Sequence, residues 1–232
     1  MQVGAFYPFC RNHNIWKTPD QDPAAWSSSA TAIMASALHI RYTLLPYYYT
    51  LFYKAHTQGS TVIRPLFHEY PTDKNTLDIF LQFLVGQNIM LAPVTDDGAR
   101  QVQVYIPSAD WYDYYTGVRM LSEKQYITLD APLNTIPIFL RGGAIIPTQE
   151  SANNTKYSRE KPFGLIIVLN ANGNAEGELF YDDVIDEKVT KDDLLSSIKK
   201  ETKIEAIVNE EEQNKLISLL QINIQHHRCK RQ

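Results

Sequence analysis

The first hydrophobic run of the chain, Ala5 to Phe9, is followed at once by the polar cluster Arg11-Asn12-His13-Asn14. An apolar run of this kind is typical of a buried strand in a parallel sheet, and such sheets bind ligands where their strands end. We therefore predict a strand over Phe6–Phe9 with a functional cluster at its end. The alternative is that Arg11 and His13 make only structural hydrogen bonds within a loop.

A long helical pattern follows, because glycine is absent from Ala24 to Gln58 and apolar residues recur at helical spacing. Asp22 and Pro23 are suited to the N-cap and first position of a helix. Pro46 disfavours helical geometry at Leu45 and lacks an amide hydrogen, so we expect two successive helices with a break there. Gly59 is expected to end the second helix.

From Thr61 the pattern changes to short apolar or alternating runs separated by Gly, Pro, Asn and Asp. This spacing indicates an antiparallel sandwich. The expected strands lie within Thr61–Phe67, Ile89–Val94, Val102–Ile106, Trp111–Tyr115, Tyr126–Leu129 and Ile136–Leu140. Asp73–Val85 is expected to interrupt them as a helix or helical turn.

Two further strands are expected at Phe163–Leu169 and Glu178–Asp182, with Asn172-Gly173 as the signal for a tight turn between them. After Val184 the chain has no glycine, proline or aromatic residue, and charges of both signs fill it. Its apolar residues fit helices near Leu194–Ile198 and Leu216–Leu220, although Leu220–Ile224 alternates like a strand.

Composition narrows the class of function. A chain of 232 residues with 44% apolar and 21% charged residues is typical of a folded globular protein of one or two domains. The formal charge of −4 offers no basic surface for nucleic acid. No apolar run is long enough to span a membrane, and residues 1–20 lack the pattern of a signal peptide. Two cysteines, Cys10 and Cys229, do not decide the redox compartment.

A set of ordered motifs resembles glycoside hydrolase family 31, of the maltase-glucoamylase and sucrase-isomaltase type. The motifs are Ala5–Phe9 with Arg11–Asn14, Gln21-Asp22-Pro23, Arg41–Tyr47, Arg64–Glu69, Trp111–Gly117, Leu140–Gly143 and Gly177–Asp183. Beyond residue 183 the likeness fades, since Tyr181 stands where the family usually has Trp and Val184 where it usually has Gly.

The resemblance implies a fold class that combines α/β and all-β parts. Residues 1–64 would be the C-terminal end of a (β/α)8 barrel, 65–150 a proximal antiparallel β-sandwich, and 151–232 a truncated distal β-domain with a divergent charged tail. The predicted Phe6–Phe9 strand has no upstream partner, although a parallel strand needs neighbours. Both observations lead us to expect a C-terminal fragment of a longer enzyme.

Retaining glycoside hydrolysis needs two carboxyl groups about 5 Å apart. The aspartates at Asp96-Asp97, Asp110, Asp113 and Asp182-Asp183 fit turn chemistry better than catalysis. In the family both catalytic aspartates lie N-terminal to the Phe6–Asn14 motif, so we expect no catalytic residue in this chain.

The resemblance makes His13 a substrate-binding residue that hydrogen-bonds sugar hydroxyls in the −1 subsite, since imidazole can donate and accept. Arg11 would hold the loop through a carboxylate contact or touch the sugar itself.

Trp111–Tyr115 could stack on sugar rings or form sandwich core, and the core role is favoured. Asn153-Asn154-Thr155 is an N-glycosylation acceptor at Asn153, meaningful in the secretory route. His226–Cys229 lacks the second cluster that a metal site needs, so no metal is expected.

The leading hypothesis is therefore the C-terminal part of an α-glucosidase that acts on maltose and starch-derived α-linked oligosaccharides. The isolated chain is expected to be inactive and to need no cofactor. Its partner would be the oligosaccharide substrate, without nucleic acid, and membrane attachment would come only through absent N-terminal regions. The parent enzyme would follow the secretory route to the cell surface or exterior. The alternative is a non-catalytic carbohydrate-binding or structural fragment.

Overall fold

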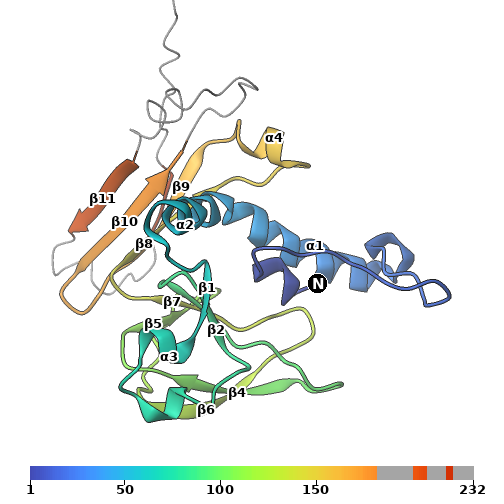
Figure 1. Ribbon diagram of the computed structural model, residues 1–232, viewed down its shortest axis with the longest axis horizontal. Helices are drawn as coiled ribbons and strands as arrows, with labels where there is room; N and C mark the ends of the chain where they lie inside the picture. The colour runs from blue at the N-terminus through green and yellow to red at the C-terminus, as the bar shows by residue number, and fades with distance from the viewer. Residues whose placement is uncertain (182–200, 208–217, 222–232) are drawn as a thin grey trace, which may run out of the picture.

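In the computed structural model, two helices lie beside two five-stranded sheets and a two-stranded ribbon (Figure 1). The structure describes residues 1–181, 201–207 and 218–221, the last two ranges by their backbone alone. An arm formed by residues 7–27 extends away from the body beyond helix α1 (Figure 1).

The two predicted helices and a break close to Pro46 are confirmed, although Leu45 is itself helical and the first helix begins later than expected, at Ser28. α1 spans Ser28–Thr43 and α2 spans Leu45–Gln58, with Leu44 between them and Pro46 in the first turn of α2. Gly59 ends α2 in the left-handed region at φ 69°. The predicted N-cap at Asp22 is also confirmed, since its side chain accepts the Ala24 amide at the start of the short 3₁₀ helix Pro23–Ala25.

The first sheet is antiparallel throughout, with strand order β1-β2-β3-β7-β5. Its strands are β1 Ile63–Pro65, β2 Phe83–Val85, β3 Ile89–Leu91, β5 Trp111–Asp113 and β7 Ile138–Arg141. β4 Gln101–Ile106 and β6 Gln125–Asp130 form a separate antiparallel ribbon. Two short helical turns, α3 Leu66–Glu69 and η3 Lys74–Thr76, lie between β1 and β2. Only the single turn η3 lies in the expected helical stretch 73–85, which ends in strand β2.

The second sheet has the order β11-β10-β8-β9-β12. Its strands are β8 Ala144–Gln149, β9 Phe163–Val168, β10 Asn174–Phe180, β11 Glu201–Ile207 and β12 Ser218–Gln221, and α4 Thr155–Ser158 lies between β8 and β9. The predicted turn at Asn172-Gly173 is confirmed, with the Gly173 amide donating to the Asn170 carbonyl over 2.9 Å. The strands it joins lie on either side of β8, a strand the sequence analysis did not predict.

Other predictions for the C-terminal residues are tested in part. The strand expected at Glu178–Asp182 begins earlier, at Asn174. β12 overlaps the start of the alternating stretch Leu220–Ile224, so the helix expected near Leu216–Leu220 is wrong over residues 218–220. Leu194–Ile198, Asp182-Asp183 and His226–Cys229 lie outside the described residues.

The predicted strand over Phe6–Phe9 is wrong. Gly4–Phe6 form one turn of 3₁₀ helix, and the chain then bends outward, with Phe9 73% exposed. Its backbone carbonyls are satisfied by side chains instead of a neighbouring strand: Arg41 donates to Ala5, Tyr7 and Pro8, and Tyr48 donates to Phe6. Side chains therefore do here what a sheet partner would do in a strand.

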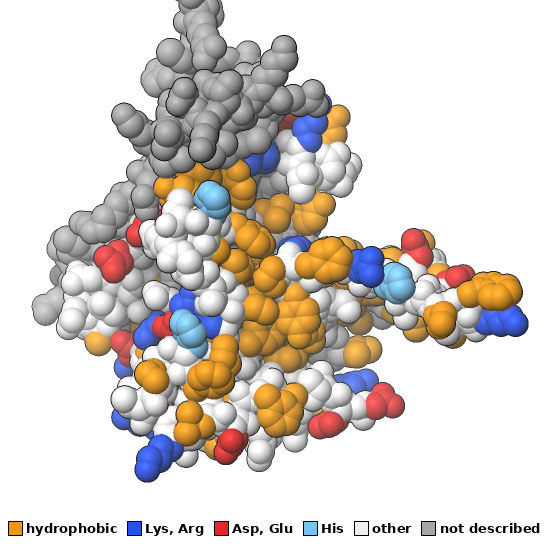
Figure 2. Space-filling model, in the orientation of Figure 1, with side chains coloured by type: hydrophobic (Ala, Val, Ile, Leu, Met, Phe, Trp, Pro, Cys, Tyr) orange, Lys and Arg blue, Asp and Glu red, His pale blue; other side chains and the backbone are white. Residues whose placement is uncertain are grey.

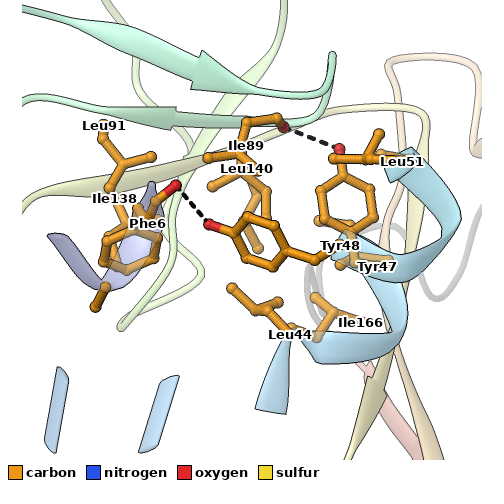
Figure 3. Close-up of a cluster of buried hydrophobic side chains, with 14 of the residues drawn as sticks. Phe6, Leu44, Tyr47, Tyr48, Leu51, Ile89, Leu91, Ile138, Leu140 and Ile166 are labelled. Carbon is orange, nitrogen blue, oxygen red and sulfur yellow. Dashed lines mark hydrogen bonds between the residues drawn. The ribbon is translucent and has the colours of Figure 1, made fainter. Parts of the chain in front are cut away.

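The main core lies where α2 meets both sheets (Figure 3). Its side chains come from the helices, the first sheet and strands β8 and β9, and include Phe6, Leu44, Leu51, Ile89, Leu140 and Ile166. Two buried tyrosines of α2 carry hydrogen bonds through this core: Tyr48 to the Phe6 carbonyl over 2.8 Å and Tyr47 to the Val85 carbonyl over 3.0 Å. Helix α2 thus fixes the start of the arm and the first sheet together.

Candidate functional site

The arm of residues 7–27 carries the predicted site residues and is braced from within. The Asn12 side-chain amide donates to the Gln21 carbonyl over 2.7 Å, and that of Asn14 donates to the Pro19 carbonyl over 2.9 Å. The hydroxyl of Thr18 closes the tip by donating to the Ile15 carbonyl over 2.6 Å. These bonds hold the two sides of the arm side by side.

Arg41 fixes the root of the arm to α1. One guanidinium nitrogen donates to the Ala5 and Tyr7 carbonyls, each over 2.7 Å, and the other donates to the Pro8 carbonyl over 3.1 Å. The guanidinium also lies 5.3 Å from the ring centroid of Tyr48, within cation–π range. A planar fork with several donors suits this task, because its bond directions are fixed in advance.

His13 lies between the two asparagines that brace the arm and is exposed to solvent. No hydrogen bond links its ring to another described residue, so both ring nitrogens are open to a ligand. Arg11 is also exposed, and its guanidinium lies 5.7 Å from the ring centroid of Phe9. The expected carboxylate contact of Arg11 is not among those formed by the described residues.

Positioning residues were missed in the sequence. Arg41 was noted only as part of a motif, and no role was assigned to it or to Tyr48. One available signal was that Arg41 is the single Lys or Arg between Lys17 and Lys54. A lone cation inside an otherwise uncharged helix indicates a specific partner.

Two of the aspartates assigned to turns, Asp113 and Asp110, make turn and connecting contacts. Asp113 accepts the amides of Tyr115 and Thr116 over 3.1 and 2.7 Å. Asp110 pairs with Arg119 and accepts the Ala171 amide over 3.1 Å.

The aromatic run at β5 is mainly core. Trp111 and Tyr112 are buried, while Tyr115 is half-exposed and donates to the Ile136 carbonyl over 3.0 Å. Burial raises the pKa of Tyr115 to about 12. The favoured core role is therefore confirmed for the first two rings of the run.

Asn153 is exposed in the loop before α4. Its neighbour Asn154 is the N-cap of that helix and accepts the Tyr157 amide over 3.1 Å. The acceptor amide of Asn153 therefore faces no competing structural role among the described hydrogen bonds.

Within the part of the chain that the structure describes, no group of three or more His, Cys, Asp or Glu side chains is arranged to hold a metal ion. None of the described helices combines the length and apolar character needed to cross a membrane.

Two family descriptions match this architecture in chain order. Residues 1–51 match the TIM-barrel domain of the glycosyl hydrolases family 31, and residues 59–146 match the family 31 C-terminal domain. The boundary between them falls at the end of α2, where Gly59 terminates the helix.

Curated relatives and solved structures agree. The chain is 50% identical over 183 residues to probable maltase-glucoamylase 2 of Homo sapiens, covering 79% of this chain and 7% of that protein. It is 48% identical over 183 residues to intestinal sucrase-isomaltase of Homo sapiens, covering 79% and 10%. The solved ER glucosidase II heterodimeric complex is similar with a TM-score of 0.75 and 36% identity, over 78% of this chain and 20% of that one.

The chain spans 7% and 10% of the length of these two human relatives. The two matched domains nevertheless contain the arm, helix α1, the first part of α2 and all strands of the first sheet. With the two domain matches in the same order, this likeness shows that the chain belongs to glycosyl hydrolase family 31.

Proposed function

We propose that this chain is the C-terminal part of an α-glucosidase that releases α-linked glucose from maltose and starch-derived oligosaccharides. The observation that carries the proposal is the arm: His13 is presented to solvent on a braced segment whose root is fixed by Arg41 and Tyr48. A ligand-binding residue must be both open and positioned, and His13 meets both conditions.

In this proposal residues 1–64 belong to a (β/α)8 barrel, 65–150 form a proximal β-sandwich, and 151–232 belong to a distal β-domain. Exposed apolar side chains on the arm support the first assignment, because Phe9, Ile15 and Trp16 are the kind of surface that further barrel elements would cover. The antiparallel pairing of the first sheet supports the second.

His13 binds a hydroxyl of the sugar at the −1 subsite and neither gives nor takes the catalytic proton. One ring nitrogen donates while the other accepts, which matches a hydroxyl that does both. Arg11 adjoins it on the arm and assists in holding the sugar or the loop. Hydroxyl contacts that strengthen as the sugar ring flattens toward an oxocarbenium-like state lower the barrier selectively.

The reaction is proposed to retain configuration, with a nucleophilic aspartate and an acid–base aspartate supplied from outside this chain. Support comes from the described aspartates, which are engaged in turns and connections. The isolated chain should therefore bind sugar without hydrolysing it. Loss of proton-transfer assistance alone is worth about 10²–10⁴ in rate.

The competing function is a non-catalytic carbohydrate-binding or structural module. The test is hydrolysis of a chromogenic α-glucoside by this chain and by a chimera in which it replaces the aligned 183-residue segment of human sucrase-isomaltase. We expect the chimera to hydrolyse the substrate and the isolated chain to show no hydrolysis above background. A folded but inactive chimera would favour the binding module, and turnover by the isolated chain that an internal aspartate substitution abolishes would overturn the proposal.

The parent enzyme is proposed to pass through the secretory route, with Asn153 glycosylated. The relatives named above include an intestinal enzyme and an ER complex, and the Asn153 amide is exposed. Expression in a secreting cell should give a product that an N-glycan amidase shortens on a gel. The variant Thr155→Ala should abolish that shift.

A further inference from the structure

A polar cavity of about 320 Å³ lies between α2, the β2–β3 turn and the β8–β10 side of the second sheet. No residue of the arm lines it, so neither His13 nor Arg11 borders it. Its volume is within the usual range for small-molecule sites. Helix α2 and strands of both sheets form its walls, so its shape is set by the packing of the fold.

The charges around this cavity balance. Lys54 forms an ion pair with Glu178, and Arg64 donates to Glu69 over 2.5 Å just behind the wall. Glu176 is the remaining charged lining residue. Two cations and two carboxylates thus line the cavity, which gives neither a simple anion nor a simple cation an electrostatic advantage.

Hydrogen-bonding groups remain unused there. The Arg64 side chain is only 7% exposed, yet its Nε finds no hydrogen-bond partner in the structure. The side-chain amides of Gln58, Gln87 and Asn88 also line the cavity, and none hydrogen-bonds to another described residue. A buried unsatisfied donor is unusual and calls for a partner, which can be a ligand hydroxyl.

The cavity also has an apolar part. Leu51 and Ile145 line it together with the ring of Tyr47. Amide and guanidinium groups beside a small apolar wall suit a ligand whose hydroxyls lie at the edge of a ring with C–H faces. A sugar ring has this combination of groups.

We propose that this cavity is a second carbohydrate site that holds one hexose ring or a disaccharide through Arg64, Gln87 and Asn88. It retains an α-glucan away from the arm. The inference concerns binding alone and does not depend on the hydrolytic function proposed above.

The test is isothermal titration of the full chain with maltose, with sulfate as the anionic comparison. Saturable binding of maltose is expected. Asn88→Ala and Gln87→Ala should each weaken it about threefold to tenfold, the size of one lost hydrogen bond. Gln87 is exposed on a turn, so its truncation leaves folding intact, as circular dichroism will verify.

Two matched variants separate this site from the rest of the molecule. Asn172→Ala and Gln125→Ala each truncate an exposed side-chain amide outside the cavity, and both should leave maltose affinity unchanged. Absence of saturable binding would overturn the proposal. So would loss of binding in His13→Ala with retention in the cavity variants, or binding of sulfate in place of maltose.

Discussion

The arm and the core around α2 differ in how their apolar side chains are used. In the arm, Ile15 and Trp16 are 75% and 86% exposed, and local side-chain bonds keep its two sides together. In the core, side chains of the same kind, such as Ile138, are fully buried between helix and sheets. The body is stabilised by burial, whereas the arm depends on a few directed hydrogen bonds.

The two regions meet at Arg41 and Tyr48. Both belong to the helices, and both bond to carbonyls at the base of the arm. Figure 2 shows the consequence for the surface: the arm projects from the body with apolar and cationic side chains interleaved along it. A segment built in this way presents groups to a ligand without relying on a core of its own.

The largest contrast is expected between the same substitution in the two regions. Ile138→Ala should lower the free energy of unfolding by about 2–5 kcal/mol, because it opens a cavity in the first sheet. Ile15→Ala should change it by about 0.5 kcal/mol or less, since that side chain is already in water. Urea unfolding followed by circular dichroism measures both, and equal losses would contradict the distinction between the regions.

The next effect concerns the junction. Arg41→Lys keeps the charge, but a lysine ammonium cannot bond all three carbonyls at the root of the arm. The attachment of the arm should therefore lose about 1.5–3 kcal/mol, the contribution of one hydrogen bond to a charged group. Trypsin should then cleave after Arg11 and Lys17 several times faster than in the wild type. Arg100→Lys is the control, because the exposed Arg100 side chain donates to the carbonyl of its neighbour Ala99 and to no other described residue. Unchanged cleavage in Arg41→Lys would show that the arm is held by other means.

High pH should weaken the core specifically. Burial raises the pKa of Tyr47 and Tyr48 above the ordinary value of about 10, although the Arg41 charge opposes this for Tyr48. Above pH ~10 the unfolded chain loses protons that the folded protein keeps, so stability is present below that pH and is lost as pH rises. The slope should be about 1.4 kcal/mol per pH unit for each tyrosine.

Urea midpoints measured at successive pH values between 9 and 11 give that slope. Tyr47→Phe removes one titrating group and should reduce it, even if the lost bond to Val85 lowers stability at every pH. A slope identical to that of the wild type would show that the buried hydroxyl of Tyr47 does not set the alkaline limit.

The helices could be predicted because their signals are local. Pro46 has no amide hydrogen with which to continue α1 but is tolerated in the first turn of α2, and Gly59 adopts a left-handed backbone that other residues avoid. The N-cap at Asp22 depends on residues two positions away. Such features depend little on the remainder of the fold.

The secondary structure was predicted wrongly where contacts with residues distant in the sequence determine it. Ala5–Phe9 reads as a strand by composition, but Arg41 and Tyr48 take its carbonyls from more than 30 positions away. β8 was missed because it follows two glycines and contains Pro147. The proline is tolerated because β8 meets β10 only at Ala144, so Pro147 pairs with β9 alone.

The candidate site was likewise predictable only in part. The motif around His13 could be found in the sequence, and the structure places it open on the arm. The division at residues 64 and 150, the glycosylation of Asn153 and the role of Arg11 stay predictions.

The smallest effect on stability, and the most informative one on function, is expected at His13. Its ring is exposed and makes no hydrogen bond with the described residues, so His13→Ala should change the free energy of unfolding by no more than about 0.5 kcal/mol.

In the active chimera the same change should lower kcat/KM at least ~10-fold, because a hydroxyl contact and its desolvation are lost together. If the contact strengthens in the transition state, kcat falls as well as kcat/KM. A deoxy substrate lacking the contacted hydroxyl should be poor with the wild type and hardly worse with the variant. Wild-type constants in His13→Ala would leave the arm without a role in binding at the residue on which the proposed function depends.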